Sequence, residues 1–244
     1  MYYKDLIKMQ RYPHSWCPGC GIGSVLKNTA KVLAGMNFDC TNTIAVSGIG
    51  CSGRMAGYLN MDAVHTLHGR ALTCAEAIKT MRPQYNVIVL SGDGDLFSIG
   101  GNHFLHPARR DPDITVVCNN NEIYGLTAGQ YSPTTPKGTY TTTSPKGCKY
   151  EPLDVHGILR TMPRYFYARS TVWHVLHMQK CIQEAIQWKG FAFVDVVSDC
   201  IEINGRHIGY KKASEMFAMY KEKYKIVRDV EVLGPHDLGV VKKG

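Results

Sequence analysis

The sequence has no long run of apolar residues. Its longest apolar runs, such as residues 87–90 and 191–197, have the length of β-strands and are too short to span a bilayer. Residues 1–12 are polar and basic, and they contain no apolar segment typical of a signal peptide. We therefore expect a cytoplasmic protein with no membrane partner.

Acidic residues are in the minority, with 20 Asp and Glu against 28 Lys and Arg, so the formal net charge is +8. Such a charge can attract nucleic acid, an acidic protein or an anionic cofactor. Many of the cations lie near the C-terminus, where they indicate either a solvated helix face or a surface for an acidic partner. A basic RNA-binding module with a zinc knuckle would not need the acidic and amide residues described below. We expect no nucleic-acid partner.

The sequence also lacks the features of a secreted disulfide-bonded protein, although it contains nine cysteines. The number is odd and no export signal is visible, so metal ligands or buried thiols explain the cysteines better. Cys17 and Cys20 form one Cys-x-x-Cys turn, and Cys51 and Cys200 each follow a predicted strand. Such a set fits an iron–sulfur cluster, whose four thiolates can come from distant segments. A zinc site, a redox-active dithiol and unliganded cysteines remain alternatives.

Apolar stretches alternate with segments of helical periodicity along the chain. The predicted strands are residues 43–47, 86–91, 113–119, 165–168 and 191–197, and the clearest helices are residues 173–188 and 213–224. Continuous apolar runs are typical of strands that helices cover on both faces. The fold class is therefore α/β, a doubly wound and mostly parallel sheet with helices on both faces. Residues 130–152 show no periodicity and predict an extended loop that is either mobile or folded over a site.

Polar, glycine-rich segments follow several of the predicted strands, where ligands bind in this architecture. Gly92-Asp93-Gly94 follows one strand, and Asn121 lies just after the next. Glycines permit the close approach of a diphosphate, and Mg²⁺ prefers oxygen ligands with few carboxylates. Asp93, Asn121 and the carbonyl of Ile123 can supply such a set, although each segment alone also fits a plain turn. Together they have the pattern typical of thiamine-diphosphate enzymes.

Taken together, these residues resemble the β subunit of the 2-oxoacid:ferredoxin oxidoreductases, most of all the 2-oxoglutarate branch. The similarity runs from about Ser15 to about Arg206. Each motif is weak alone, but their order and spacing are specific. The motifs are Trp16-Cys17-Pro18-Gly19-Cys20-Gly21, Gly48-Ile49-Gly50-Cys51-Ser52, His68-Gly69-Arg70, Gly92-Asp93-Gly94-Asp95, Gly100-Gly101-Asn102-His103, Tyr124-Gly125-Leu126-Thr127 and Gln130-Tyr131-Ser132-Pro133-Thr134-Thr135.

The resemblance implies a role for each site residue. It assigns a [4Fe–4S] cluster to Cys17, Cys20, Cys51 and Cys200, and Mg²⁺ to Asp93, Asn121 and Ile123. It assigns contacts with thiamine diphosphate to Ile49, Gly50, Cys51, Ser52, His68, Gly92, Gly94, Asp95, Gly125 and Leu126. Residues 1–210 would form the domain that binds both cofactors, and residues 211–244 a basic C-terminal helix and tail.

Three residues are expected to act in catalysis or substrate choice. His68 would lie near the diphosphate, although its residue type alone fits a structural histidine equally well. The guanidinium of Arg54 suits a second carboxylate of the substrate, or else belongs to the protein surface. Leu126 argues against pyruvate, because pyruvate-using relatives tend to have asparagine there. Ala128 stands where relatives often have glycine or lysine, so contacts with coenzyme A are not carried over.

The implied activity is oxidative decarboxylation of a 2-oxoacid with coenzyme A, giving an acyl-CoA and CO₂, with electrons passing through the cluster to ferredoxin. 2-Oxoglutarate is the favoured substrate, and a branched-chain 2-oxoacid or pyruvate is the alternative. A partner α subunit would complete the thiamine site, and γ and ferredoxin-like δ subunits are further candidates. A non-oxidative thiamine enzyme of the acetolactate synthase kind would share the magnesium motif but would not need the four cysteines.

Overall fold

The computed structural model describes residues 2–244, and its centre is an eight-stranded sheet with the order β2-β1-β3-β4-β8-β7-β10-β9. The strands are β1 (Thr43–Ser47), β2 (Asp62–His65), β3 (Asn86–Gly92), β4 (Ile114–Asn120), β7 (Tyr165–Thr171), β8 (Phe191–Val197), β9 (Lys225–Ile226) and β10 (Asp237–Lys243). A separate small sheet joins β5 (Ile123–Tyr124) to β6 (Gln130–Tyr131). From β2 to β7, neighbouring strands are parallel, and only β10 pairs antiparallel, with β7.

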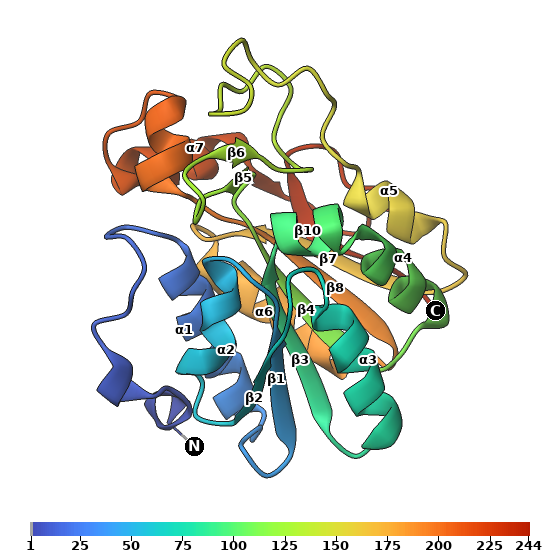
Figure 1. Ribbon diagram of the computed structural model, residues 1–244. Helices are drawn as coiled ribbons and strands as arrows, with labels where there is room; N and C mark the ends of the chain where they lie inside the picture. Colours follow the sequence, from blue (N-terminus) through green and yellow to red (C-terminus); the bar gives the residue numbers. More distant parts are fainter. Residues whose placement is uncertain (1) are drawn as a thin grey trace.

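Helices cover both faces of this sheet (Figure 1). The α-helices are α1 (Ile22–Gly35), α2 (Met55–Tyr58), α3 (Ala71–Met81), α4 (Gly101–Arg110), α5 (Val155–Arg160), α6 (Val175–Gln187) and α7 (Ala213–Lys223). One buried apolar cluster contains side chains of α1, α2, α6 and α7, and the other contains side chains of α3, α4 and α5. The predicted fold class is therefore confirmed.

The five predicted strands are all present as β1, β3, β4, β7 and β8. Strands β4 and β8 are buried at every position, as expected of continuous apolar runs in the middle of a sheet. The two predicted helices correspond to α6 and α7. Within residues 2–244, no helix is long and apolar enough to cross a bilayer.

The C-terminal segment differs from the expected helix and tail. Helix α7 lies where the helix was predicted, but Asp237–Lys243 is a strand of the main sheet and not a tail. Leu238 and Val241 of this strand are buried, while its last two residues, both lysines, are exposed, which suits a strand near the sheet edge. The division into domains at residue 210 stays a prediction, but this end of the chain completes the sheet.

The loops that follow β1, β3, β4 and β8 meet at one edge of the sheet, because these strands are parallel. They contain residues 48–54, 93–95, 121–129 and 198–200. The predicted irregular loop begins with the short strand β6 (Gln130–Tyr131), which was not expected, and is irregular from residue 132 to residue 152. This loop is folded onto the protein, because the side chains of Ser132, Thr134 and Thr135 are buried. Its first part therefore belongs to the environment of the same edge.

Candidate active site

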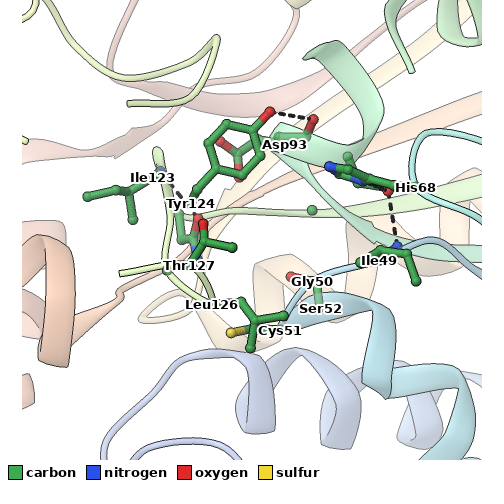
Figure 2. A pocket seen from close by; sticks show the side chains of 15 residues that line it. Ile49, Gly50, Cys51, Ser52, His68, Asp93, Ile123, Tyr124, Leu126 and Thr127 are labelled. Atoms are coloured by element: carbon green, nitrogen blue, oxygen red, sulfur yellow. Dashed lines mark hydrogen bonds and ion pairs between the residues drawn. The ribbon is translucent and has the colours of Figure 1, made fainter. Parts of the chain in front are cut away.

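One cavity at this edge contains the residues expected to bind thiamine diphosphate and magnesium. Figure 2 shows side chains that reach it from the loops after β1, β3 and β4 and from the segment before α3. The lining residues are Ile49, Gly50, Cys51, Ser52, His68, Gly92, Asp93, Gly94, Asp95, Asn121, Ile123, Tyr124, Gly125, Leu126 and Thr127. We call it the diphosphate cavity.

Asp95 joins three of the loops around this cavity. Its Oδ1 accepts hydrogen bonds from the main-chain N–H groups of Ile49 (3.0 Å) and Gly69 (2.8 Å) and from Nδ1 of His68 (2.5 Å). Its Oδ2 accepts a bond from the hydroxyl of Ser91 at 2.7 Å. The carboxylate is almost completely buried, and these donors compensate its desolvation. Asp95 therefore holds the loops together and orients the imidazole of His68.

Three oxygen atoms converge beside Asp93. The side-chain oxygen of Asn121 faces Oδ1 of Asp93 at 3.1 Å and the carbonyl oxygen of Ile123 at 2.7 Å. Turning the amide would let its NH₂ group donate to both of these acceptors, whereas the orientation with the oxygen inward accepts only a long bond from the N–H of Ile123 (3.4 Å). In the latter orientation, a cation between the three oxygens would satisfy all of them. A carboxylate, an amide oxygen and a main-chain carbonyl are ligands that suit Mg²⁺, so these residues fit the metal.

The other carboxylate oxygen of Asp93, Oδ2, accepts a hydrogen bond from the loop that follows β6. The hydroxyl of Thr134 donates to Oδ2 of Asp93 at 2.7 Å. Burial raises the pKa of Asp93, while hydrogen bonds from Ser132 and Thr134 oppose this shift. The hydrogen bonds favour the ionised carboxylate that a metal site requires, and a bound cation would favour it further.

A second cavity lies next to the first and contains four cysteines. Its lining residues are Ser15, Trp16, Cys17, Cys20, Ile22, Cys51, Arg54, Asn121, Gly125, Leu126, Cys200, Ile201, Glu202 and Ile203. Cys17 and Cys20 lie in the turn before α1, Cys51 follows β1, and Cys200 follows β8. The indole N–H of Trp16 donates to the carbonyl of Cys51 at 2.8 Å and ties the first turn to the second loop. We call it the cysteine cavity.

The cysteine thiols affect one another's protonation. Burial raises the pKa of Cys20 to about 12, with further upward contributions from Asp199, Cys200 and Cys51. Burial and neighbouring cysteines likewise raise the pKa values of Cys51 and Cys200. In such a setting thiolates need positive charge to form, and the iron of a cluster supplies it.

All nine cysteines are free thiols, and within residues 2–244 no three His, Cys, Asp or Glu side chains surround one point closely enough to bind a single metal ion. A zinc ion needs such a tight arrangement, because its ligands lie at bonding distance from one atom. A four-iron cluster has an extended inorganic core with thiolates around it. Four thiols around one cavity are the set of donors that such a cluster takes.

The two cavities share Cys51, Asn121, Gly125 and Leu126. Gly125 lies between them, because a Cβ atom at this position would be 3.1 Å from Sγ of Cys200 and 4.0 Å from the amide nitrogen of Asn121. The oxygens beside Asp93 and the four thiols are thus separated by little more than one glycine. This arrangement suits a site that transfers electrons from an organic cofactor to a cluster.

Comparison with known proteins agrees with these features. A family model described as "Thiamine pyrophosphate enzyme, C-terminal TPP binding domain" matches residues 48–196. The chain is 44% identical over 216 residues to the 2-oxoglutarate synthase subunit KorB of Methanocaldococcus jannaschii, covering 88% of this chain and 80% of the relative. It belongs to the 2-oxoacid:ferredoxin oxidoreductase family, as a β subunit.

Other relatives extend the similarity to almost the whole chain. KorB of Archaeoglobus fulgidus is 41% identical over 243 residues, covering 99% of this chain and 89% of the relative. The solved structure of 2-oxoglutarate:ferredoxin oxidoreductase from Magnetococcus marinus with 2-oxoglutarate, coenzyme A and succinyl-CoA bound superimposes with a TM-score of 0.87. The sequence identity is 31%, and the match covers 99% of this chain and 84% of that one. As a β subunit, the chain is one part of a multi-subunit oxidoreductase.

The structure brings all of the predicted site residues to these two neighbouring cavities, although their individual roles stay predictions. Arg54 lines the cysteine cavity and a third cavity of about 610 Å³, which also contains Lys8, Arg11 and His65. Leu126 is 51% exposed and lines all three cavities. It therefore stands where the cofactor, the cluster and an anionic ligand would meet.

Several contributing residues were not assigned a role from the sequence. Tyr124 donates a hydrogen bond to the carbonyl of Gly94 at 3.1 Å, and a Cβ atom on Gly94 would lie 2.4 Å from its ring. Thr134 holds Asp93 from a loop with no helical or strand pattern. Both residues lie in motifs of the family resemblance, but only the side-chain geometry shows what they contact.

Proposed function

We propose that this chain is the β subunit of an enzyme that oxidatively decarboxylates 2-oxoglutarate with coenzyme A. The products would be succinyl-CoA and CO₂, and electrons would leave through a [4Fe–4S] cluster to ferredoxin. The observation that carries the proposal is the contact of the diphosphate cavity with the cysteine cavity at Gly125. An enzyme that moves electrons from a thiamine site to a cluster needs these two sites side by side.

The residues of the diphosphate cavity would position the cofactor. Asp93, Asn121 and the carbonyl of Ile123 would hold Mg²⁺, and Gly92 and Gly94 allow the diphosphate to approach the main chain. Bound thiamine diphosphate supplies the electron sink for decarboxylation. His68 donates a hydrogen bond from Nδ1 to Asp95, so Nε2 is the ring nitrogen that can bind a ligand in the cavity.

The residues of the cysteine cavity would hold the cluster. Cys17, Cys20, Cys51 and Cys200 provide the four thiolates that a [4Fe–4S] cluster takes. When bound, the cluster supplies a one-electron acceptor next to the thiamine site. Among the four cysteines, only Cys51 lines both cavities, so as a ligand it would connect the cluster site to the thiamine site.

Charge and shape around Arg54 support an anionic substrate with two carboxylates. Nη1 of Arg54 is held by Ser15 Oγ at 3.3 Å, and the guanidinium lines a cavity that contains the cations of Lys8 and Arg11 and no Asp or Glu among its lining residues. Positive charge without acidic neighbours attracts anions, including the phosphates of coenzyme A. The names of the relatives and the ligands of the Magnetococcus structure point to 2-oxoglutarate.

The proposed enzyme contains further chains. An α subunit would complete the thiamine site, and γ and ferredoxin-like δ subunits and ferredoxin are the remaining proposed partners. Nine free thiols and a cluster suit the reducing interior of a cell, so we place the enzyme in the cytoplasm.

The decisive experiment is turnover by the anaerobically purified complex. The chain is co-expressed with its partner subunits, and ferredoxin reduction is measured with coenzyme A and 2-oxoglutarate, pyruvate or a branched-chain 2-oxoacid. The proposal expects 2-oxoglutarate to have the highest kcat/KM. Faster turnover of another 2-oxoacid would correct the substrate, and decarboxylation without ferredoxin reduction would indicate the non-oxidative class.

The Arg54→Met variant tests the assignment of the second carboxylate. Loss of a charge-assisted contact costs about 1.5–3 kcal/mol, so kcat/KM for 2-oxoglutarate should fall roughly 10–100-fold. Turnover of a branched-chain 2-oxoacid should change little, since it has no second carboxylate. Arg82→Met, at the exposed end of α3, is the control for a lost surface charge.

A further inference from the structure

We call residues 130–135 the strap. They form hydrogen bonds with the two loops that carry the proposed magnesium ligands. Polar loop side chains are normally exposed, yet Ser132, Thr134 and Thr135 are 2%, 7% and 1% exposed. Their hydroxyls have partners: Thr135 donates to the carbonyl of Glu122, between the two proposed metal ligands of that loop, and Thr134 donates to Asp93. The strap therefore contacts both loops that carry the oxygen set.

Thr134 lies between two acceptors. Its Oγ1 is 2.7 Å from Oδ2 of Asp93 and 2.9 Å from Oδ1 of Asn120. The Asn120 amide cannot turn freely, because its NH₂ group donates to the buried carboxylate of Asp195 at 3.1 Å. The hydroxyl has one proton, and the charged carboxylate is the stronger acceptor, in agreement with its shorter distance.

We propose that Thr134 is a positioning residue for the metal: its bond to Oδ2 of Asp93 leaves Oδ1 as the only carboxylate oxygen that faces Asn121 and Ile123. The carboxylate then binds through one oxygen, in the geometry that an octahedral Mg²⁺ requires. This inference rests on the proposed magnesium role of Asp93. It adds that the strap, which makes no contact with the metal itself, sets which cation the site prefers.

The physical consequence concerns the choice between Mg²⁺ and Ca²⁺. Ca²⁺ accepts larger and more flexible ligand sets, including carboxylates that bind through both oxygens. If Oδ2 of Asp93 loses the hydrogen bond from Thr134, the carboxylate is held less firmly and can rotate to offer both oxygens. Mg²⁺ binding should then weaken more than Ca²⁺ binding.

The test compares Thr134→Val and Thr134→Ser in the assembled complex. Mg²⁺ and Ca²⁺ are titrated in the presence of thiamine diphosphate, and binding is measured by calorimetry without substrate. Loss of an outer hydrogen bond to a metal ligand typically costs 10–100-fold in affinity, so Thr134→Val should bind Mg²⁺ about 10–100-fold more weakly. Its preference for Mg²⁺ over Ca²⁺ should fall about tenfold. Thr134→Ser keeps the hydroxyl and should restore both values to within about threefold of the unchanged complex.

Thr141→Val is the matched control, since Thr141 is buried in the same loop and accepts a bond from the N–H of Ser144. It should lower stability without changing the metal preference. An unchanged Mg²⁺/Ca²⁺ ratio in Thr134→Val would overturn the inference, as would an equal loss of preference in Thr141→Val. If Asp93→Ala also retained Mg²⁺ binding, the proposed metal site itself would fail; if only Asp93→Ala abolished it, the proposed site would stand and the role of Thr134 would not.

Discussion

The diphosphate cavity and the cysteine cavity differ in how their polar groups are satisfied within the protein. Around the first, Asp95 accepts four hydrogen bonds, and Asp93 is held by Thr134. Beside the second, Ser198 Oγ and both carboxylate oxygens of Asp199 are buried without hydrogen-bond partners. Buried polar groups without partners are costly. The carboxylates of the diphosphate cavity are therefore held by hydrogen bonds of the chain itself, whereas the four thiols of the cysteine cavity have no comparable set of donors.

The largest expected effect comes from Asp93→Ala. It removes the only carboxylate of the oxygen set, so thiamine-diphosphate binding by the assembled complex should weaken at least about 100-fold. Iron content should stay unchanged, because Asp93 does not line the cysteine cavity. Calorimetry and iron analysis measure the two properties separately. Undiminished cofactor affinity would disprove the magnesium assignment, and Asp113→Ala, which removes a partly exposed ion pair with Lys79, serves as the control.

Cys200→Ser should have the converse effect. It removes one thiolate of the cluster, so the complex should lose iron or become sensitive to oxygen, and ferredoxin reduction should fall by more than about tenfold. Thiamine-diphosphate affinity should change by no more than a few-fold. The exposed Cys40 provides the control variant Cys40→Ser, with full iron content expected. Full iron content and turnover in Cys200→Ser would show that another residue is the fourth ligand.

Two glycine variants test whether each cavity can be disturbed without changing the other. In Gly94→Ala the new Cβ would overlap the ring of Tyr124, whereas in Gly125→Ala it would press on Sγ of Cys200. Both backbones accept alanine, so overpacking is the main cost, about 1–3 kcal/mol. Gly94→Ala should weaken thiamine-diphosphate binding about tenfold, and Gly125→Ala should mainly alter the electron paramagnetic resonance spectrum of the reduced cluster. Equal effects of both variants on both properties would contradict the separation.

The smallest effect concerns His156 in helix α5, which lines neither of the two cavities. His156 is buried against Tyr167, with ring centroids 4.8 Å apart, and burial is the main cause that lowers its pKa to about 4. The unfolded chain takes up this proton near pH 6.5 and the folded chain does not, so stability is present above pH 6.5 and is lost as the pH falls toward 4. His156→Phe keeps the ring and should reduce the loss between pH 7 and pH 5 by up to about 2 kcal/mol in urea unfolding. If His156→Phe loses as much stability as the unchanged chain between pH 7 and pH 5, groups other than His156 cause the acid sensitivity.

The sequence predicts the central strands well because burial on both faces makes them continuous apolar runs, as in β4 and β8. The edge strand β2 was not predicted, since all of its four residues are exposed and no pattern marks it. Strand β10 was not predicted either, because two lysines end it and its partner β7 is distant in sequence. A strand that forms mainly because it pairs with a neighbouring strand has little recognisable pattern in its own sequence.

The site residues could be predicted because the family motifs follow one another in a specific order. Their physical roles could not, since a role depends on which atoms face each other. Asp95 was assigned to the cofactor from its motif, and the structure adds that its carboxylate accepts hydrogen bonds from Ile49, His68, Gly69 and Ser91.

The proposed enzyme needs two metal centres in adjoining cavities of this chain. Crystals of the assembled complex, prepared anaerobically with thiamine diphosphate and with Mn²⁺ in place of Mg²⁺, allow anomalous scattering to be measured at the iron and manganese edges. We predict iron among Cys17, Cys20, Cys51 and Cys200, and manganese between Asp93, Asn121 and Ile123, with Gly125 between the two centres. Iron elsewhere, zinc among the four cysteines, or manganese away from Asp93 would contradict the account.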